Sequence, residues 1–288
     1  MSLPDVVHDW FLAEARDLPW RRAGTTPWGV MVSEFMLQQT PVARVEPIWT
    51  AWMATWPTPA ALASASRADV LRAWGKLGYP RRALRLHAAA EAIRDAHGGV
   101  VPSDVDELEA LPGVGAYTAR AVAAFGYGRR CPVVDTNVRR VVARAVHGAG
   151  DAGRARVAAD LADVDALLPR DDARAAVISA GLMELGAVVC TARAPRCGAC
   201  PVHALCAWRA AGHPEYTGPR KAVQAYAGTD RQVRGRLLDV LRAAEAPVER
   251  AALDAVWADA AQRDRCLFSL LEDGLTEQLP DGRFALPA

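Results

Sequence analysis

The sequence predicts an all-α protein that ends in a small β-hairpin. Apolar residues recur at helical spacing through most of the 288 residues, whereas no comparable series of alternating strands is present. Turn-forming residues divide the first 210 positions into short helices joined by compact turns. The helical spacing is plainest in Val30, Val32, Phe35, Met36 and Leu37 and in Leu84, Leu86, Ala89, Ala90 and Ile93. The turns are expected at 57–59, 78–80, 98–99 and 111–113.

The composition predicts a globular protein of two or three domains. Hydrophobic residues make up 51% of the chain, which is enough to bury a full core and excludes a disordered tail. No apolar run reaches membrane-spanning length, and residues 1–5 lack the basic-then-apolar pattern of a signal peptide. We therefore expect a cytoplasmic protein with no membrane partner.

Charge is distributed unevenly although the formal net charge is only +1. Residues 71–90 contain five bases and no acid, and residues 120–147 contain six arginines against the single acid Asp135. Such segments indicate either a surface that attracts nucleic acid or simply an Ala- and Arg-rich composition.

The last 60 residues form a module of their own. Gly, Pro and Tyr residues between 211 and 229 indicate a linker, and three helical patterns follow at 231–245, 248–258 and 260–273. A turn at Pro280-Asp281-Gly282 then predicts a hairpin over 276–286. Three helices and a hairpin predict a winged-helix-like module at 230–288.

Four cysteines, Cys190, Cys197, Cys200 and Cys206, are the most specific motif. Four thiolates at this spacing suit a [4Fe-4S] cluster. Zinc is the alternative, since four cysteines also make a tetrahedral site and His203 could replace one of them. Zinc ribbons, however, usually carry two Cys-x2-Cys hooks, and only one occurs here. Cys131 and Cys266 are expected to be buried structural thiols.

Residues 111–118 have the form of a helix-hairpin-helix. Gly113 and Gly115 free backbone amides at a helix start, where they attract phosphate without a side chain. The pattern favours contact with a nucleic-acid backbone, although an ordinary helix corner can look the same.

Two acids are candidate catalytic groups. Asp135 precedes the helical segment 136–141 and is expected to be its N-cap, with a carboxylate that stays ionised to low pH. A lone glutamate on a helix is usually at the surface, but Glu34 lies among apolar residues. Partial burial would raise its pKa and suit it to act as a general acid.

Together these motifs resemble one known family. Its elements are Trp28 to Glu34 with Met36 to Thr40, Leu77-Gly78-Tyr79, Leu111 to Gly115, Val134 to Val138, and Met183 to Ala187 before the four cysteines. Over residues 10–208 the chain resembles the helix-hairpin-helix DNA glycosylases with an iron–sulfur cluster, and among them the MutY-type adenine DNA glycosylases.

The resemblance implies removal of adenine mispaired with 8-oxoguanine or guanine in double-stranded DNA, by a monomer that is nucleoid-associated when bound. It implies a cluster-bearing domain at 1–24 and 134–210 and a six-helix barrel at 25–133, with the helix-hairpin-helix at 108–125 and the linker at 211–229. The active cleft would lie between them, with Glu34 on one wall and Asp135 on the other.

The resemblance also implies roles for single residues. Glu34 would protonate N7 of an extruded adenine, and Asp135 would stabilise the oxocarbenium-like sugar. We expect Tyr117 and Asn137 beside these two acids, and Arg16, Trp20 and Glu184 in the pocket. The expected DNA-contacting residues are Gln38, Gln39, Tyr79, Arg81, Gly113, Val114 and Gly115.

Three alternatives remain open at this stage. An endonuclease III-like enzyme would cut the strand through a Schiff base, but that family places lysine at position 117, where this chain has Tyr117. A thymine-mismatch glycosylase tolerates tyrosine there, and a non-catalytic DNA-binding protein would not need both Glu34 and Asp135. The chain departs from some MutY-type members at Pro80, and from many in lacking a β-rich C-terminal domain.

Overall fold

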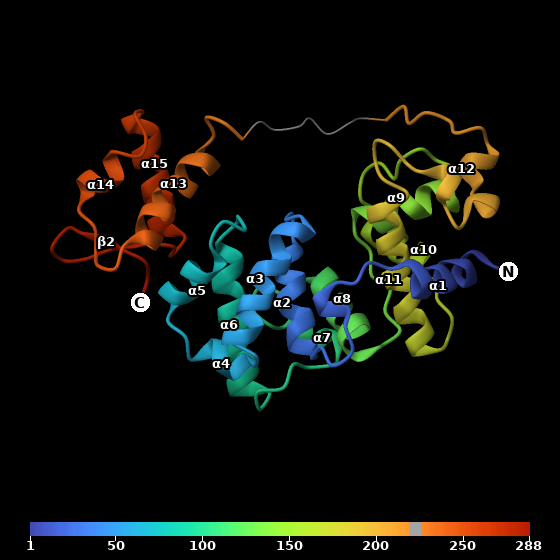
Figure 1. Ribbon diagram of the computed structural model, residues 1–288, viewed down its shortest axis with the longest axis horizontal. Helices are drawn as coiled ribbons and strands as arrows, with labels where there is room; N and C mark the ends of the chain where they lie inside the picture. The colour runs from blue at the N-terminus through green and yellow to red at the C-terminus, as the bar shows by residue number, and fades with distance from the viewer. Residues whose placement is uncertain (219–225) are drawn as a thin grey trace. The chain divides into compact units, whose positions relative to one another are not determined.

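The computed structural model describes residues 1–218 and 226–288, and it confirms the all-α prediction (Figure 1). Residues 219–225, part of the predicted linker, lie outside the described residues. None of the described helices is long and apolar enough to cross a membrane. The chain divides into two compact units: Met1–Met31 with Pro102–Ala110 and Val114–Lys221, and Val32–Val101 with Leu111–Gly113 and Ala222–Ala288.

The first unit contains helices from three separate stretches of the chain. They are α1 (Leu3–Glu14), the start of α2 (Pro27–Leu37), α7 (Val105–Glu109), α8 (Ala116–Tyr127), α9 (Thr136–Ala145), α10 (Val157–Asp165), α11 (Asp172–Val188) and α12 (Ala207–Ala210). Short 3-10 turns lie at Pro19–Arg21, Cys197–Ala199 and His203–Leu205.

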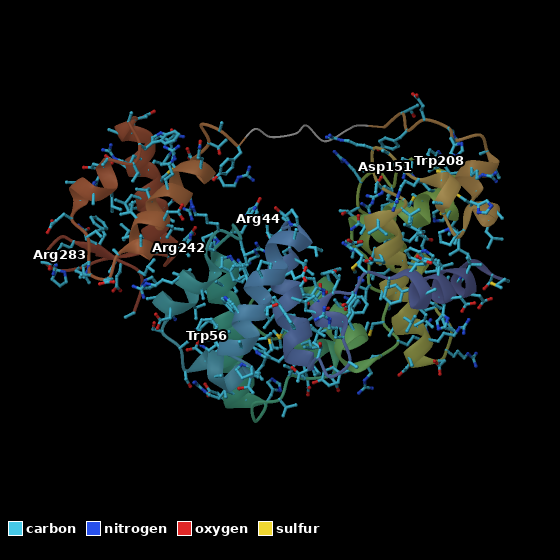
Figure 2. All side chains as sticks on the ribbon, viewed as in Figure 1. Arg44, Trp56, Asp151, Trp208, Arg242 and Arg283 are labelled. Carbon is cyan, nitrogen blue, oxygen red and sulfur yellow. The ribbon has the colours of Figure 1, made fainter. Side chains whose placement is uncertain are left out.

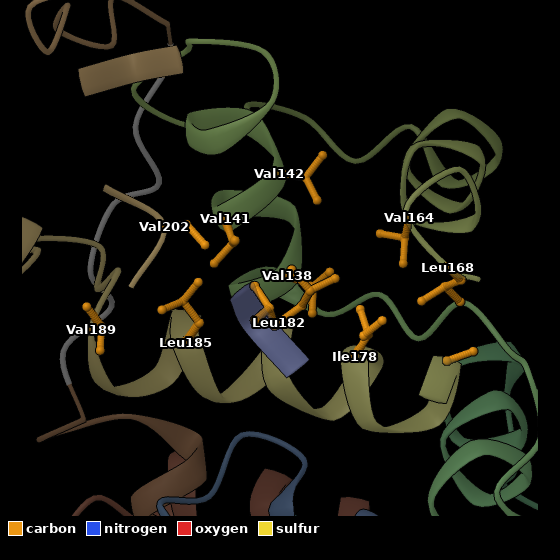
Figure 3. Close-up of a cluster of buried hydrophobic side chains, with 12 residues drawn as sticks. Val138, Val141, Val142, Val164, Leu168, Ile178, Leu182, Leu185, Val189 and Val202 are labelled. Carbon is orange, nitrogen blue, oxygen red and sulfur yellow. The ribbon is translucent and has the colours of Figure 1, made fainter. Parts of the chain in front are cut away.

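Helix α11 is the central helix of the first unit, and α1, α8 and α9 all pack against it. It is apolar on several faces, so its side chains can enter a core on more than one side. Figure 3 shows the main cluster of this core, in which side chains of α9, α10 and α11 meet. Its members include Val138, Val141, Val142, Val164, Leu168, Ile178, Leu182, Leu185, Val189 and Val202.

Polar residues fix where these helices begin. Asp104 and Asp171 are the N-caps of α7 and α11, and each accepts hydrogen bonds from backbone amides of the first turn. Helix α8 ends at Gly128, which has a left-handed backbone. The caps at Asp104 and Gly128 fix the chain direction before and after the hairpin, and Asp171 fixes the start of α11.

The second unit contains the remaining helices and the only strands in the described residues. Its elements are the end of α2, α3 (Val42–Thr55), α4 (Pro59–Ala63), α5 (Arg67–Trp74), α6 (Arg81–Ala96), α13 (Asp230–Ala243), α14 (Arg250–Asp254), α15 (Ala260–Glu272), β1 (Glu277–Gln278) and β2 (Phe284–Ala285). Helix α6 packs against α4 and α5 and buries Leu86 and Ile93 completely. Trp52 and Trp74 meet edge to face at 5.6 Å.

The C-terminal residues fold as three helices and a hairpin, as the sequence predicts. Strands β1 and β2 are antiparallel, and Val248 forms an isolated bridge with Phe284. Because Val248 pairs as a strand residue, the second helix is shorter than the predicted 248–258 and covers only Arg250–Asp254. The order helix, bridge, two helices and hairpin is that of a winged helix.

Helix α13 contacts α5, so that this module packs on neighbouring helices of its own unit. Arg242, labelled in Figure 2, is mostly buried and donates a hydrogen bond to the carbonyl of Leu71 at 3.0 Å. Residues 230–288 contain eight arginines and eleven acids, a formal charge of −3. Several of these arginines form ion pairs within the module: Arg234 with Asp273, Arg250 and Arg263 with Asp254, Arg265 with Asp230, and Arg283 with Asp281.

Candidate active site

Asp135 is the N-cap of α9, as predicted. Its Oδ1 accepts hydrogen bonds from the backbone amides of Asn137 and Val138 at 2.8 and 2.7 Å, and its Oδ2 accepts one from the Asn137 side chain at 2.8 Å. The expectation of a low pKa was wrong. Burial raises the pKa of Asp135 above 3.8, because the loss of water outweighs these three hydrogen bonds.

Asn137 is held in turn by Arg140. The Arg140 guanidinium donates to the Asn137 side-chain oxygen at 2.8 Å, to the carbonyl of Gly186 at 2.8 Å and to the carbonyl of Cys190 at 2.7 Å. A continuous series of hydrogen bonds therefore joins Asp135 to the backbone of the first cysteine of the motif. The sequence did not indicate this role of Arg140, because nothing in the sequence distinguishes it from its neighbour Arg139. In the structure Arg139 forms an ion pair with Asp160 instead.

Helices α9 and α11 approach each other very closely at Gly186. A Cβ atom at this position would lie 2.7 Å from the Cβ of Asn137 and 2.8 Å from its carbonyl oxygen. Only glycine fits without displacement of one helix. The approach brings Arg140 within reach of the last carbonyls of α11.

Glu184 is a buried carboxylate with two cationic partners. It receives hydrogen bonds from Arg16 at 2.5 and 2.8 Å and from Arg21 at 3.0 Å. Burial alone would raise the pKa of Glu184, but the bond from Arg16 and the charges of Arg21 and Arg16 lower it below 4.5. The structure thus brings the predicted pocket residues Arg16 and Glu184 together, and it adds Arg21, which the sequence analysis missed.

Tyr117 lies in the first turn of α8, in the same unit. Its hydroxyl contacts the sulfur of Met183 at 3.9 Å. Met183 precedes Glu184 on α11, so the ring faces the same helix that carries this carboxylate. Trp20, the other predicted pocket residue, is buried in the 3-10 turn beside Arg21.

Glu34 lies in the second unit, on α2. It is 6% exposed, and its neighbours Ser33 and Phe35 are 0% and 1% exposed. A solvated surface position, the usual one for a lone glutamate, is therefore excluded. A buried carboxyl on an apolar helix is a candidate proton donor.

Two exposed residues of the second unit have a left-handed backbone although they are not glycine. Gln39 has φ 56° and follows the end of α2, whereas Tyr79 has φ 49° and precedes α6. Gln38 precedes Gln39, and Arg81 lies two residues after Tyr79. Arg81 forms a 3.1 Å ion pair with Asp273. Gln38, Gln39 and Tyr79 thus lie on two loops of one unit, and Arg81 begins α6 shortly after the second loop.

The predicted hairpin is present between α7 and α8. Leu111 and Val114 are buried and anchor the turn, and Gly113 has φ +76°. Gly115 is the N-cap of α8, which has no acid in its first turn, and nothing lies within 4 Å of the place of its missing Cβ. Open amides at a helix start are suited to hold a phosphate.

The four cysteines of the motif line one pocket, together with apolar residues such as Val189 and Val202. Among the described residues, no group of three or more metal-binding side chains is compact enough for a single metal ion. Burial raises the pKa of Cys200 to about 11, so this thiol would be protonated without a metal. Arg144 lies 3.4 Å from the Cys190 sulfur and above the Trp208 ring, a position the sequence did not indicate.

Comparison with known proteins agrees with this arrangement. The chain is 64% identical over 279 residues to an adenine DNA glycosylase of Mycobacterium tuberculosis. The aligned residues cover 96% of this chain and 91% of that protein. It is also 64% identical over 288 residues to the adenine DNA glycosylase of Mycolicibacterium smegmatis, and that alignment covers 99% of this chain and 97% of that protein. The chain belongs to the adenine DNA glycosylase family.

Further matches fit this family of DNA-acting hydrolases. The model of the HhH-GPD superfamily of base excision DNA repair proteins matches residues 32–164, and the iron–sulfur binding domain of endonuclease III matches residues 190–206. A thermostable thymine-DNA glycosylase has a similar structure, with a TM-score of 0.65 and 25% identity over 72% of this chain and 95% of that one. This adenine DNA glycosylase therefore has a [4Fe-4S] cluster as cofactor, and the zinc alternative is set aside.

Proposed function

We propose that this adenine DNA glycosylase removes adenine paired with 8-oxoguanine or guanine and leaves the strand intact. The observation that carries the proposal is the local environment of three side chains, each taken within its own unit. Glu34 is a buried carboxyl and Asp135 is a half-buried one, whereas Tyr117 stands at the position where the endonuclease III-like family has the lysine of a lyase. A tyrosine hydroxyl of pKa about 10 is a poor nucleophile near neutral pH.

The DNA is held first by its backbone. The backbone amides of Gly113, Val114 and Gly115, just before α8, donate hydrogen bonds to a phosphate, and Arg81 adds a positive charge. Adenine must leave the stack before its glycosidic bond can be reached. Gln38, Gln39 and Tyr79 enter the space around the extruded base, a role that their exposed loops support.

Glu34 donates a proton to N7 of the extruded adenine, which makes the base a better leaving group. Its burial supports this role, because a carboxyl enclosed by apolar side chains is kept away from bulk water. After the base leaves, the ionised Glu34 can take a proton from the attacking water.

Asp135 stabilises the positive charge that develops on the sugar as the bond from N9 to C1′ lengthens, either electrostatically or through transient covalent capture. Its fixed geometry supports this role, since three hydrogen bonds hold both carboxyl oxygens in place. Asn137 acts through Asp135. Arg16, Trp20 and Glu184 shape the pocket, with Glu184 charged and held by its two arginines.

The cluster is assigned to Cys190, Cys197, Cys200 and Cys206, which fit it because all four line one cavity. Domains at 1–24 with 134–210 and at 25–133 are part of the same proposal. The packing of α1 on α11 and of Val7 among the core residues of α9 and α11 supports the first of them. We further propose that the enzyme is a monomer that works in the cytoplasm on the nucleoid.

One assay tests the proposed reaction. Three duplexes are incubated with the enzyme and analysed with and without alkali. The first has adenine opposite 8-oxoguanine, the second has adenine opposite guanine, and the third has an oxidised pyrimidine. Strand breaks that appear only after alkali are expected for the first two. Breaks without alkali would refute the strand-sparing reaction, and excision of the pyrimidine alone would refute the adenine specificity.

A further inference from the structure

Arg82 is a buried arginine with an unusual set of partners. It is 6% exposed at the start of α6, and burial lowers its pKa to about 10. In the part of the chain that the structure describes, no carboxylate forms an ion pair with it, and its Nε has no hydrogen-bond partner. A buried charge of this kind is costly, so its position calls for a specific explanation.

The guanidinium joins the two loops that carry the left-handed residues. Its Nη1 donates to the carbonyls of Phe35 and Met36 at 2.7 and 3.0 Å, in the last turn of α2. Its Nη2 donates to the Thr40 hydroxyl at 3.0 Å and to the Gly78 carbonyl at 2.9 Å. These acceptors flank Gln39 on both sides and precede Tyr79 directly.

Two further contacts tighten the same connection. The Thr40 hydroxyl lies 3.1 Å from the carbonyl of Leu77 and so forms a direct bond between the two loops. The guanidinium also lies over the ring of Trp74 at 5.1 Å and over the ring of Tyr79 at 5.6 Å. Arg82 therefore contacts the backbone before Tyr79 and the face of its ring as well.

Both loops need such support. A left-handed backbone costs a residue other than glycine about 1–2 kcal/mol, and it persists only where the surroundings enforce it. At Tyr79 the following Pro80 restricts the backbone further. Gln39 is exposed and Tyr79 is 44% exposed, so the strain serves side chains that project outward and are not part of a core.

We propose that Arg82 is a positioning residue that holds Gln39 and Tyr79 together in the conformation needed to extrude adenine. The inference rests on the proposed function, which assigns these two side chains to the space around the extruded base. A lysine could not substitute, because one ammonium group cannot reach acceptors on both loops in the fixed geometry of a guanidinium.

Arg82→Met and Arg82→Lys test the proposal. Single-turnover excision from an adenine·8-oxoguanine duplex should fall by about 10- to 100-fold in Arg82→Met, which corresponds to the strain of one or two such residues. Arg82→Lys should recover only part of the rate. Binding to undamaged duplex should change less than about threefold, since Arg82 is buried. Excision at the wild-type rate in either variant would overturn the proposal.

Leu86→Ala is the matched control for a purely structural effect. Leu86 is fully buried one turn further along α6, and its truncation should clearly lower the melting temperature, because it leaves a cavity in the core. Its excision rate below the melting transition should stay close to wild type. If Leu86→Ala loses excision as strongly as Arg82→Met does, the effect is one of general destabilisation and the proposal fails.

A double-mutant cycle separates this proposal from the proposed function. Arg82→Met is combined with Gln39→Ala and Tyr79→Ala, and it should then cause little further loss, because Arg82 acts through these two residues. A full additional loss in that background would refute the positioning role alone. If the Gln39→Ala and Tyr79→Ala changes themselves leave excision intact, the assigned role of the two side chains is wrong, and the proposal falls with it.

Discussion

The side-chain amide of Asn137 donates a 2.8 Å hydrogen bond to Asp135, while its oxygen accepts one from Arg140. The amide can therefore present only its NH₂ group to the carboxylate. This bond favours the ionised form of Asp135 and opposes the effect of burial, which raises its pKa above 3.8.

Asn137→Ala should consequently raise the pKa of Asp135 further. If catalysis needs Asp135 ionised, the acid limb of the single-turnover rate should move to higher pH, while the rate at its plateau falls less. A pH–rate profile between pH 4 and 8 measures the shift. An unchanged acid limb with a uniformly lower rate would show that Asn137 does not act through the charge of Asp135.

Glu34→Gln should abolish excision and leave DNA binding largely intact, because the amide keeps the size of the side chain but cannot donate a proton to N7. The loss should reach about 100-fold or more, the usual contribution of general acid catalysis. Excision is followed under single-turnover conditions and binding by titration of a labelled duplex. Retained excision would remove Glu34 from the acid role.

Tyr117→Lys should introduce some strand cutting. The side chain at this position lies in the first turn of α8 and faces Met183, so an amine there would lie against the helix that carries the proposed pocket residue Glu184. Borohydride trapping of an enzyme–DNA adduct measures Schiff-base formation. Tyr117→Phe is the control, and a complete absence of trapped adduct with the lysine variant would weaken the placement of Tyr117 near the sugar.

Glu184→Gln should destabilise the first unit by about 3 kcal/mol, because it leaves the charges of Arg16 and Arg21 without their buried partner. The pKa of Glu184 is lowered on folding, so its contribution is present above about pH 4.5 and is lost as the pH falls through the folded value. The difference in unfolding free energy from wild type should accordingly shrink in acid. Asp69→Asn, in an exposed pair with Arg72, should change stability by less than about 1 kcal/mol.

Gly186→Ala should force α9 and α11 apart, since the new methyl group would lie 2.7 Å from the Cβ of Asn137. We expect a loss of about 1–3 kcal/mol in stability and a larger relative loss of excision. Gly235→Ala, within α13, would place its methyl group in ordinary contact with the Tyr226 hydroxyl at 3.6 Å and should be neutral or slightly stabilising. Equal behaviour of the two variants in thermal unfolding would contradict the close approach.

Local signals predicted the elements well. The apolar run after Pro27, the cap at Asp135 and the turn at Pro280-Asp281-Gly282 each depend on neighbours in the chain, and the structure contains all three. The helix expected at 248–258 was partly wrong because Val248 pairs with Phe284, a partner 36 positions away that no local pattern reveals.

In the candidate site, too, the sequence predicted what depends on neighbours in the chain and missed what depends on distant residues. The acids and cysteines were visible from their motifs, whereas the arginines that hold them were not. Arg82, Arg140 and Arg21 look like any other arginine of an Arg-rich chain until the fold surrounds them with carbonyls and a carboxylate. The pKa of Asp135 was misjudged for a related reason, since the hydrogen bonds of a cap are local but the burial that outweighs them is not.

The charge of the winged-helix-like module bears on how this enzyme searches a genome. A protein slides on undamaged DNA through the phosphates that it neutralises. With its net negative charge and its paired arginines, the module has little positive charge to offer to these phosphates, so we expect the helices before residue 211 to supply most of the contact with undamaged DNA. On this expectation, the appended module leaves the movement of the enzyme along undamaged DNA largely unchanged.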